Sequence, residues 1–165
     1  MHDPQPTPTF DTWYVDAHPQ LVRGLAARCG GDVALATDMV DEAMVRALER
    51  WSRVSVMASP NAWTYRVATN LLRRHFLRRG GERRALARTQ PTPEWTAIVE
   101  PSPLWDAVAE LSAKEREAIV LRYVMGFAEA EIGVALDISE GSASSLLSRA
   151  RKRLRAQVDR TGALR

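Results

Sequence analysis

Cysteine, lysine and long apolar runs are all scarce in this chain of 165 residues. The single cysteine, Cys29, excludes an internal disulfide and a zinc site built from several thiolates. No stretch approaches the apolar length that crosses a bilayer, and the N-terminus lacks the basic and then apolar pattern of a secretion signal. The sequence therefore predicts a cytoplasmic protein that is not inserted in a membrane.

Signals of catalysis are missing as well. The three histidines, His2, His18 and His75, are scattered and lie near no candidate nucleophile. The chain has no glycine-rich phosphate loop and no His-x-x-x-His pair. We therefore expect no enzymatic activity, no catalytic residue, no metal site and no cofactor.

Positive and negative charges are separated along the chain. Basic and acidic residues number 5 and 8 in residues 1–60, 8 and 1 in 61–90, 0 and 4 in 91–110, and 10 and 7 in 111–165. The net charges of these blocks are −3, +7, −4 and +3, which add up to the +3 of the whole chain. Two basic blocks on either side of an acidic one predict two surfaces that face a polyanion.

An all-α fold is expected, because no segment alternates apolar and polar residues as a strand does. Residues 1–9, rich in proline and threonine, predict a disordered tail before a first helical domain over 10–80. Within that domain, Gly30-Gly31 should end one helix, Asp32 should cap the next, and Ser59-Pro60 should open a third. The expected helices cover about 12–29, 32–51 and 60–80.

A linker and a second helical domain are expected after this. Residues 81–103 contain four prolines and are long for a connection inside one domain, so they predict a linker. In the second domain, 104–160, a short helix leads to Leu111, and Ser112 and Glu115 form a capping-box pattern. Helices at about 113–126, 129–136 and 142–157 then have the order of a helix-turn-helix.

Each of the three main helices is expected to have a packed face and an outward face. At helical spacing, the second helix packs through Val40, Ala43, Met44, Ala47, Leu48 and Trp51. Its outward stripe is formed by Asp38, Asp41, Glu42 and Glu49, with Val45 among them. This stripe is either a solvated helix surface or a docking face for a basic partner.

The residue pattern of the third helix predicts a face that binds nucleic acid. Its core side is expected to hold Tyr65, Val67, Ala68, Leu71, Leu72 and Phe76, and its outward side Trp63, Arg66, Asn70, Arg73, Arg74 and Leu77. Arginines attract phosphates and an aromatic ring stacks on an unpaired base. The alternative is that Trp63 packs on a neighbouring helix, since tryptophan is usually mostly buried.

The last helix divides in a similar way. Ala143, Leu147, Ala150 and Leu154 are expected to pack inward, which leaves Ser142, Ser144, Ser145, Ser148, Arg149, Arg151 and Lys152 outward. Serines and cations suit contacts in a DNA major groove. The basic residues also complement the C-terminal end of a helix dipole, which does not explain the serines.

These segments resemble the small bacterial sigma factors of the extracytoplasmic-function (ECF) type, which contain conserved regions 2 and 4. ATDMVDEAMVRAL resembles region 2.2, PNAWTYRVATNLLRR resembles regions 2.3 to 2.4, and LSAKEREAIVLRYVMGFAEAEIGVALDISEGSASSLLSRARKRL resembles region 4. The resemblance covers about residues 13–79 and 104–157. The family commonly has a lysine and an arginine where this chain has Ser144 and Leu146.

The resemblance implies the partners and site residues. Core RNA polymerase, through its β′ and β subunits, would be bound with Asp38, Val40, Asp41 and Glu42. The −10 promoter element would be recognised and melted by Asn61, Trp63, Arg66, Asn70, Arg73 and Arg74. The −35 element would be contacted by Ser142, Ser144, Ser145, Ser148, Arg149, Arg151 and Lys152. The acidic linker, with Glu94, Glu100 and Asp106 in and beside it, would enter a polymerase channel, and an anti-sigma factor is a further expected partner.

Two other classes of protein remain open on the sequence alone. One is a helix-turn-helix regulator of the response-regulator type, which would bind duplex DNA without polymerase. The other is a helical adaptor with no nucleic-acid role, which the arginine-rich faces disfavour. A nuclease or recombinase is disfavoured by the missing catalytic cluster.

Overall fold

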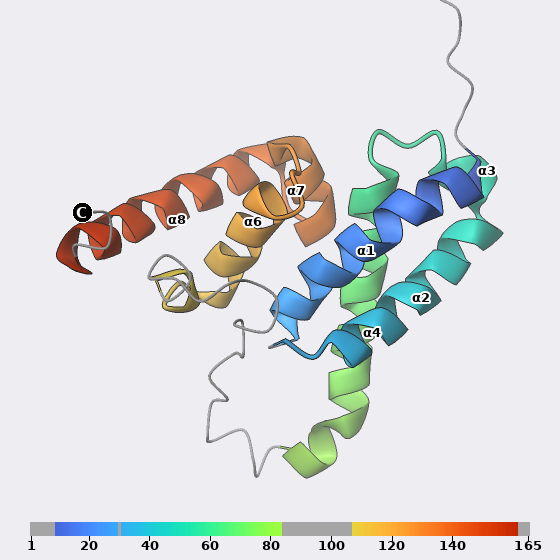
Figure 1. Ribbon diagram of the computed structural model, residues 1–165, viewed down its shortest axis with the longest axis horizontal. Helices are drawn as coiled ribbons and strands as arrows, with labels where there is room; N and C mark the ends of the chain where they lie inside the picture. The colour runs from blue at the N-terminus through green and yellow to red at the C-terminus, as the bar shows by residue number, and fades with distance from the viewer. Residues whose placement is uncertain (1–8, 30, 84–106, 162–165) are drawn as a thin grey trace, which may run out of the picture.

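The computed structural model describes residues 9–29, 31–83 and 107–161, and these residues form helices and the turns between them (Figure 1). The helices are α1 (Phe10–Arg28), α2 (Val33–Glu49), α3 (Trp51–Val54), α4 (Pro60–Arg83), α6 (Ala113–Tyr123), α7 (Glu129–Leu136) and α8 (Glu140–Thr161). The all-α prediction is confirmed. The predicted tail and linker lie almost wholly outside the described residues.

Most helices begin where the sequence predicts, because a side chain satisfies the free N–H groups of the first turn. The Asp32 carboxylate accepts from the Leu35 N–H at 2.9 Å, and the Ser59 hydroxyl accepts from the Ala62 N–H at 3.2 Å. Ser112 and Glu115 form the predicted capping box at the start of α6. Gly31, after α1, has a φ of 89°, a conformation that glycine adopts without strain.

Several helix boundaries differ from the predictions by two to four residues, and two of them concern the candidate site. Helix α4 continues through residues 80 and 81 to Arg83, so the glycine pair does not end it. Helix α8 begins at Glu140, two residues before the predicted start. The Ser139 hydroxyl accepts from the Ser142 N–H at 3.2 Å, so the turn before α8 is shorter than predicted and Ser139 caps the helix.

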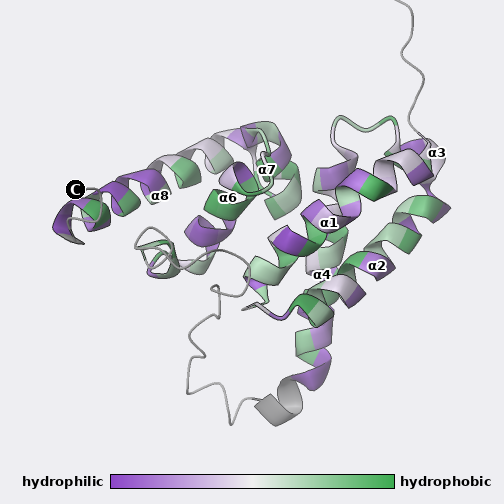
Figure 2. Cartoon of the chain, in the orientation of Figure 1, coloured by the Kyte–Doolittle hydropathy of each residue, from purple (hydrophilic) through white to green (hydrophobic). Residues whose placement is uncertain are grey.

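The helices form two bundles that we name by their order in the chain. The N-terminal bundle packs α1, α2 and α4 around Leu21, Leu25, Val40 and Tyr65, while the C-terminal bundle packs α6, α7 and α8 around residues such as Leu147. Apolar residues lie on the inner sides of these helices (Figure 2). Two predicted core residues are exposed instead. Phe76 is 39% exposed because the last turns of α4 extend beyond α1 and α2 (Figure 1), and Leu48 lies at the outer edge of the packed face of α2.

The two bundles pack against each other, α4 on α7 and α1 on α6. Gly24 of α1 lies at this contact, where an added Cβ atom would require the Met125 side chain to shift. The Gln20 amide donates to the Met125 carbonyl at 2.6 Å. The predicted division into domains at 10–80 and 104–160 stays a prediction, but the described helices make one continuous core.

Candidate nucleic-acid and partner interfaces

The predicted acidic stripe of α2 is on the surface. Asp38, Asp41 and Glu42 are exposed. His18 of α1 lies 2.7 Å from Asp41, and the Arg46 guanidinium lies 2.6 Å from Glu42. Each of these contacts leaves part of its carboxylate open to solvent, so the stripe can still meet a basic surface.

Val40 does not belong to this surface. Its side chain is 0% exposed and packs in the core of the N-terminal bundle. The prediction that Val40 contacts polymerase is therefore wrong for a side-chain contact, because the helical repeat turns this residue inward.

An apolar strip borders the acidic stripe, and of its residues only Val45 was predicted to face outward. Val45 is 56% exposed and Leu48 is 53% exposed. Both line a shallow cleft of about 260 Å³ with Asp41 and the rings of Phe10 and Tyr14 of α1. Two exposed aliphatic side chains three positions apart on a charged helix were the available signal for it.

The arginine-rich face of α4 has the predicted residues at its surface. Asn70, Arg73 and Arg74 are exposed, while Trp63 and Arg66 are half-buried. Arg66 is engaged, since its guanidinium lies 2.7 Å from the carboxylate of Asp137, in the turn between α7 and α8. The side chains on this face could contact phosphates and an unstacked base.

Asn61 has a structural role inside the N-terminal bundle. Its side-chain carbonyl accepts from the Trp13 indole N–H at 2.6 Å, and its amide donates to Gln20 at 2.9 Å. Both hydrogen bonds join α4 to α1, so Asn61 has a structural role here, and its contact with the −10 element stays a prediction. The helical spacing of Asn61 from the buried Tyr65 and Ala68 was the signal that it faces a neighbouring helix.

The outward residues of α8 form a polar and basic surface. Ser142, Ser145, Ser148, Arg149, Arg151 and Lys152 are exposed, and Ser144 is half-buried. Two of them also serve the fold, because Ser142 lies 2.8 Å from the hydroxyl of Ser139 and Arg151 lies 3.8 Å from Glu129. Leu146 is buried and faces the cleft toward α4, not the outward surface.

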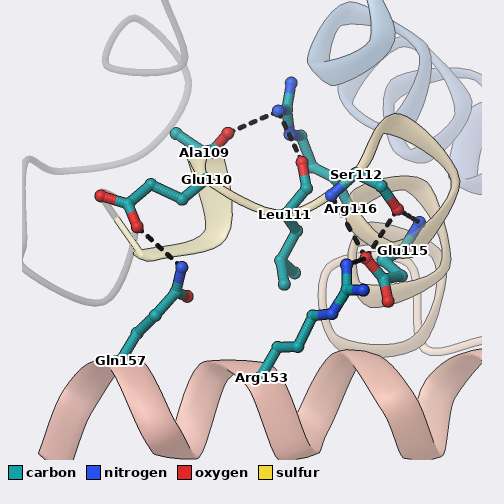
Figure 3. Close-up of polar contacts among 8 residues, drawn as sticks. All are labelled: Ala109, Glu110, Leu111, Ser112, Glu115, Arg116, Arg153 and Gln157. Carbon is teal, nitrogen blue, oxygen red and sulfur yellow. Dashed lines mark hydrogen bonds and ion pairs between the residues drawn. The ribbon is translucent and has the colours of Figure 1, made fainter. Parts of the chain in front are cut away.

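Polar contacts fix the far end of α8 to the start of α6 (Figure 3). Arg153 donates to the Glu115 carboxylate at 2.7 Å, and Gln157 donates to Glu110 at 2.7 Å. Burial alone would raise the pKa of Glu115, but the hydrogen bonds from Ser112 and the Arg153 guanidinium outweigh burial and lower it. The ionised carboxylate thus holds the outward face of α8 in position.

A second buried carboxylate lies where the two bundles meet. Glu117 of α6 forms an ion pair with Arg28 of α1 and accepts from the Tyr65 hydroxyl of α4 at 3.2 Å. Burial, and then the Glu117 charge, raise the pKa of Tyr65 well above its usual value, so the phenol stays protonated and donates. Three helices from both bundles therefore converge on one carboxylate.

The described residues contain no cluster of side chains suited to hold a metal ion. Burial raises the pKa of the Cys29 thiol to about 12, with a further contribution from Asp32, so the reactive thiolate is not formed at neutral pH. No helix in the described part of the chain is long and apolar enough to cross a membrane.

Families of known proteins match the two segments that resemble regions 2 and 4. Residues 14–82 match the family Sigma-70 region 2, and residues 102–154 match Sigma-70, region 4. The ECF RNA polymerase sigma factor SigL of Mycobacterium tuberculosis is 33% identical over 158 residues, which cover 91% of this chain and 89% of that protein. The ECF RNA polymerase sigma factor EcfG of Rhodopseudomonas palustris is 27% identical over 147 residues, covering 86% of this chain and 81% of that protein.

A solved structure has the same fold. The sigma factor RpoE of Bartonella quintana, crystallised in complex with the anti-sigma factor NepR, superposes with a TM-score of 0.69 at 21% identity. The match covers 91% of this chain and 96% of that one. The two family segments in this order, and the identity to SigL over most of both chains, establish that this chain belongs to the ECF RNA polymerase sigma factors.

Proposed function

We propose that this chain joins core RNA polymerase, directs it to promoters with −10 and −35 elements, and helps to open the DNA. It would act only through binding, without catalytic chemistry, and in the cytoplasm of a bacterium. The relatedness to SigL over both regions supports this role and does not favour a response-regulator type of helix-turn-helix protein.

The acidic stripe of α2 is the proposed contact with polymerase. Asp38, Asp41 and Glu42 offer a negative surface, and the adjoining Val45 and Leu48 offer apolar area that a partner would cover. Among the described residues Asp38 has no hydrogen-bond or ion-pair partner, so its charge is fully available. Such a combination fits a basic, partly apolar surface of the β′ subunit, with further contacts to the β subunit.

Helices α4 and α8 are the proposed DNA contacts. The −10 strand would be bound by residues of α4, namely Trp63, Arg66, Asn70, Arg73 and Arg74. Opening a duplex costs a few kcal/mol for each extruded base, and a protein without ATP chemistry must recover this by binding the opened strand better than the duplex. A tryptophan beside arginines supplies that preference, since stacking on an aromatic ring contributes about 1–3 kcal/mol per base.

The outward face of α8 would contact the −35 element. Arg149 and Lys152 are proposed to bind phosphates, which anchors the helix, while Ser144, Ser145 and Ser148 are proposed to contact base edges. The acidic linker is proposed to enter a polymerase channel, and an anti-sigma factor is proposed to cover these surfaces when the protein is idle.

The proposal of polymerase binding depends on the exposed acidic stripe of α2. The test therefore changes the charge of this stripe. In the double variant Asp41→Arg with Glu42→Arg, we expect co-purification with core RNA polymerase to fall at least tenfold, because reversing two charges changes the net charge of an exposed face by four units. Circular dichroism should stay unchanged, since neither side chain is buried.

The matched control is Glu140→Arg with Asp159→Arg. Both residues are exposed on α8, and the net charge changes by the same amount. Equal binding of core polymerase by the two double variants would contradict the assignment of the stripe.

A further inference from the structure

The outer seam between α1 and α2 contains a histidine that contacts the acidic stripe. The Nε2 atom of His18 lies 2.7 Å from a carboxylate oxygen of Asp41. An ionised carboxylate only accepts hydrogen bonds, so a neutral imidazole donates to it from Nε2. The side chain of His18 is 21% exposed, whereas that of Asp41 is 54% exposed. The imidazole therefore fixes one oxygen of Asp41 from within the seam and leaves the rest of this carboxylate open to a partner.

This pair lies between two shallow clefts of the seam, where α1 and α2 run side by side (Figure 1). A cleft of about 450 Å³ is lined by His18 with Val22 of α1 and Val33 of α2. The cleft of about 260 Å³ is lined by Asp41 with apolar residues such as Val45. A partner that covers both clefts would cross the pair and exclude water from it. Charges interact more strongly where water is excluded, so the protonation of His18 would then affect binding.

The orientation of the His18 ring is restrained by its neighbours. The Tyr14 ring lies one turn before it on α1, with a centroid distance of 5.0 Å and an interplanar angle of 33°. The contact with Asp41 joins residues 23 positions apart, so it depends on the packing of α1 against α2. A ring that is already restrained loses little conformational freedom when a partner binds, which suits a positioning role.

The surroundings of His18 are negative on the side of α2. Carboxylates on the facing stripe of α2, or on the same side of α1, belong to Asp11, Asp38, Asp41 and Glu42. Two other ionisable side chains lie beside the ring, namely Tyr14 and, in the larger cleft, Arg23. Helices α4 and α6 contact other sides of α1, for example through Gln20. A proton on the imidazole therefore takes one negative unit from this surface.

We propose that His18 is a positioning residue of the polymerase-binding surface. Its neutral imidazole holds the Asp41 carboxylate in place for a basic partner, whereas its imidazolium form pairs with that carboxylate and competes with the partner. This inference rests on the proposed binding of core RNA polymerase by the acidic stripe. Histidine changes its charge between about pH 5 and pH 8, so the affinity for polymerase should rise with pH over this range.

The first test measures the dissociation constant for purified core RNA polymerase from about pH 6 to about pH 8, with the full chain labelled at its N-terminus. Over this range the affinity of the parent should rise about three- to tenfold more than that of His18→Gln. Glutamine donates from a similar position and does not titrate, so this comparison cancels any titration of polymerase. His18→Leu has no donor and should bind about two- to fivefold more weakly than His18→Gln at the upper pH.

The matched control is His75→Gln, which removes a histidine of α4 outside this seam and should keep the pH profile of the parent. A parent whose profile matches that of His18→Gln overturns the proposal and leaves the proposed function standing. So does a profile that His75→Gln flattens as much as His18→Gln does.

The second test measures the contact without polymerase. In nitrogen NMR spectra of the imidazole at about pH 8, the His18 ring signals should move in Asp41→Asn and stay in place in Glu42→Gln. The second variant removes the same charge from the neighbouring exposed position of α2. Equal movement in both variants overturns the proposal. If the contact is seen but the parent binds no core polymerase at any pH, the proposed function fails, and this inference fails with it.

Discussion

At the residue scale, Asn61 and Asn70 are the same amino acid on one helix with different surroundings. Asn61 bridges Trp13 and Gln20 between α4 and α1, while Asn70 is exposed and has no hydrogen-bond partner among the described residues. Helical periodicity places Asn61 on the same side of α4 as the buried Tyr65 and Ala68, and Asn70 on the opposite side. Val40 is a parallel case, since periodicity alone indicates burial at both positions and the resemblance overrode it.

This contrast gives a stability prediction. Asn61→Ala should lower the free energy of unfolding by about 1–3 kcal/mol, because it leaves the part-buried Trp13 indole N–H and the Gln20 side-chain carbonyl without these partners. Asn70→Ala should change it by less than about 0.5 kcal/mol. Denaturant titrations of the two variants check this, and similar losses in both would contradict the structural role of Asn61.

At the scale of elements, helix starts were predictable and helix ends were less so. Asp32, Ser59 and Ser112 each cap a helix as expected, because a cap is a local contact within three residues. The end of α4 was predicted too early, since a glycine pair weakens a helix by roughly 1 kcal/mol per residue without forcing it to stop. The anchoring of α8 by Arg153 was not predicted, because its partner Glu115 lies 38 residues earlier.

The contact between α6 and α8 gives a pH prediction. The folded-state pKa of Glu115 is lowered, so its contribution to stability is present above the unfolded value of about 4.5 and is lost as the pH falls through the folded value. Glu115→Gln should therefore be less stable than the parent at pH 7, by roughly 1–3 kcal/mol, and the difference should shrink below about pH 4.5. Thermal unfolding between pH 3 and 7 tests this, with exposed Glu140→Gln as the control. A difference that does not depend on pH would mean that the charge of Glu115 is not what holds α8.

At the scale of the whole molecule, the order of helices and the family were predictable, but the packing of the bundles on each other was not. The signals for that packing are single residues, namely Gly24, Glu117 and Asp137, whose partners lie far away in sequence. No periodic pattern marks such contacts. The acidic block at 91–110, on which the prediction for the linker depends, lies mostly outside the described residues.

Promoter opening by a bound protein is the central claim, and Trp63 is the residue that tests it. It lies half-buried on the face that carries Arg66, Asn70 and Arg73, so its ring is partly accessible to an extruded base. Burial does not by itself distinguish a stacking ring from a packing one.

The most direct measurement is run-off transcription with purified core RNA polymerase on the DNA upstream of the gene for this chain, as a full duplex and with mismatches across the −10 region. The parent protein should yield one defined transcript from both templates. Trp63→Ala should lose at least tenfold on the duplex and recover on the mismatched template, because the stacking energy is needed only to open the strands. No transcript with the parent, or an equal loss on both templates by a variant that still binds core polymerase, would contradict the account.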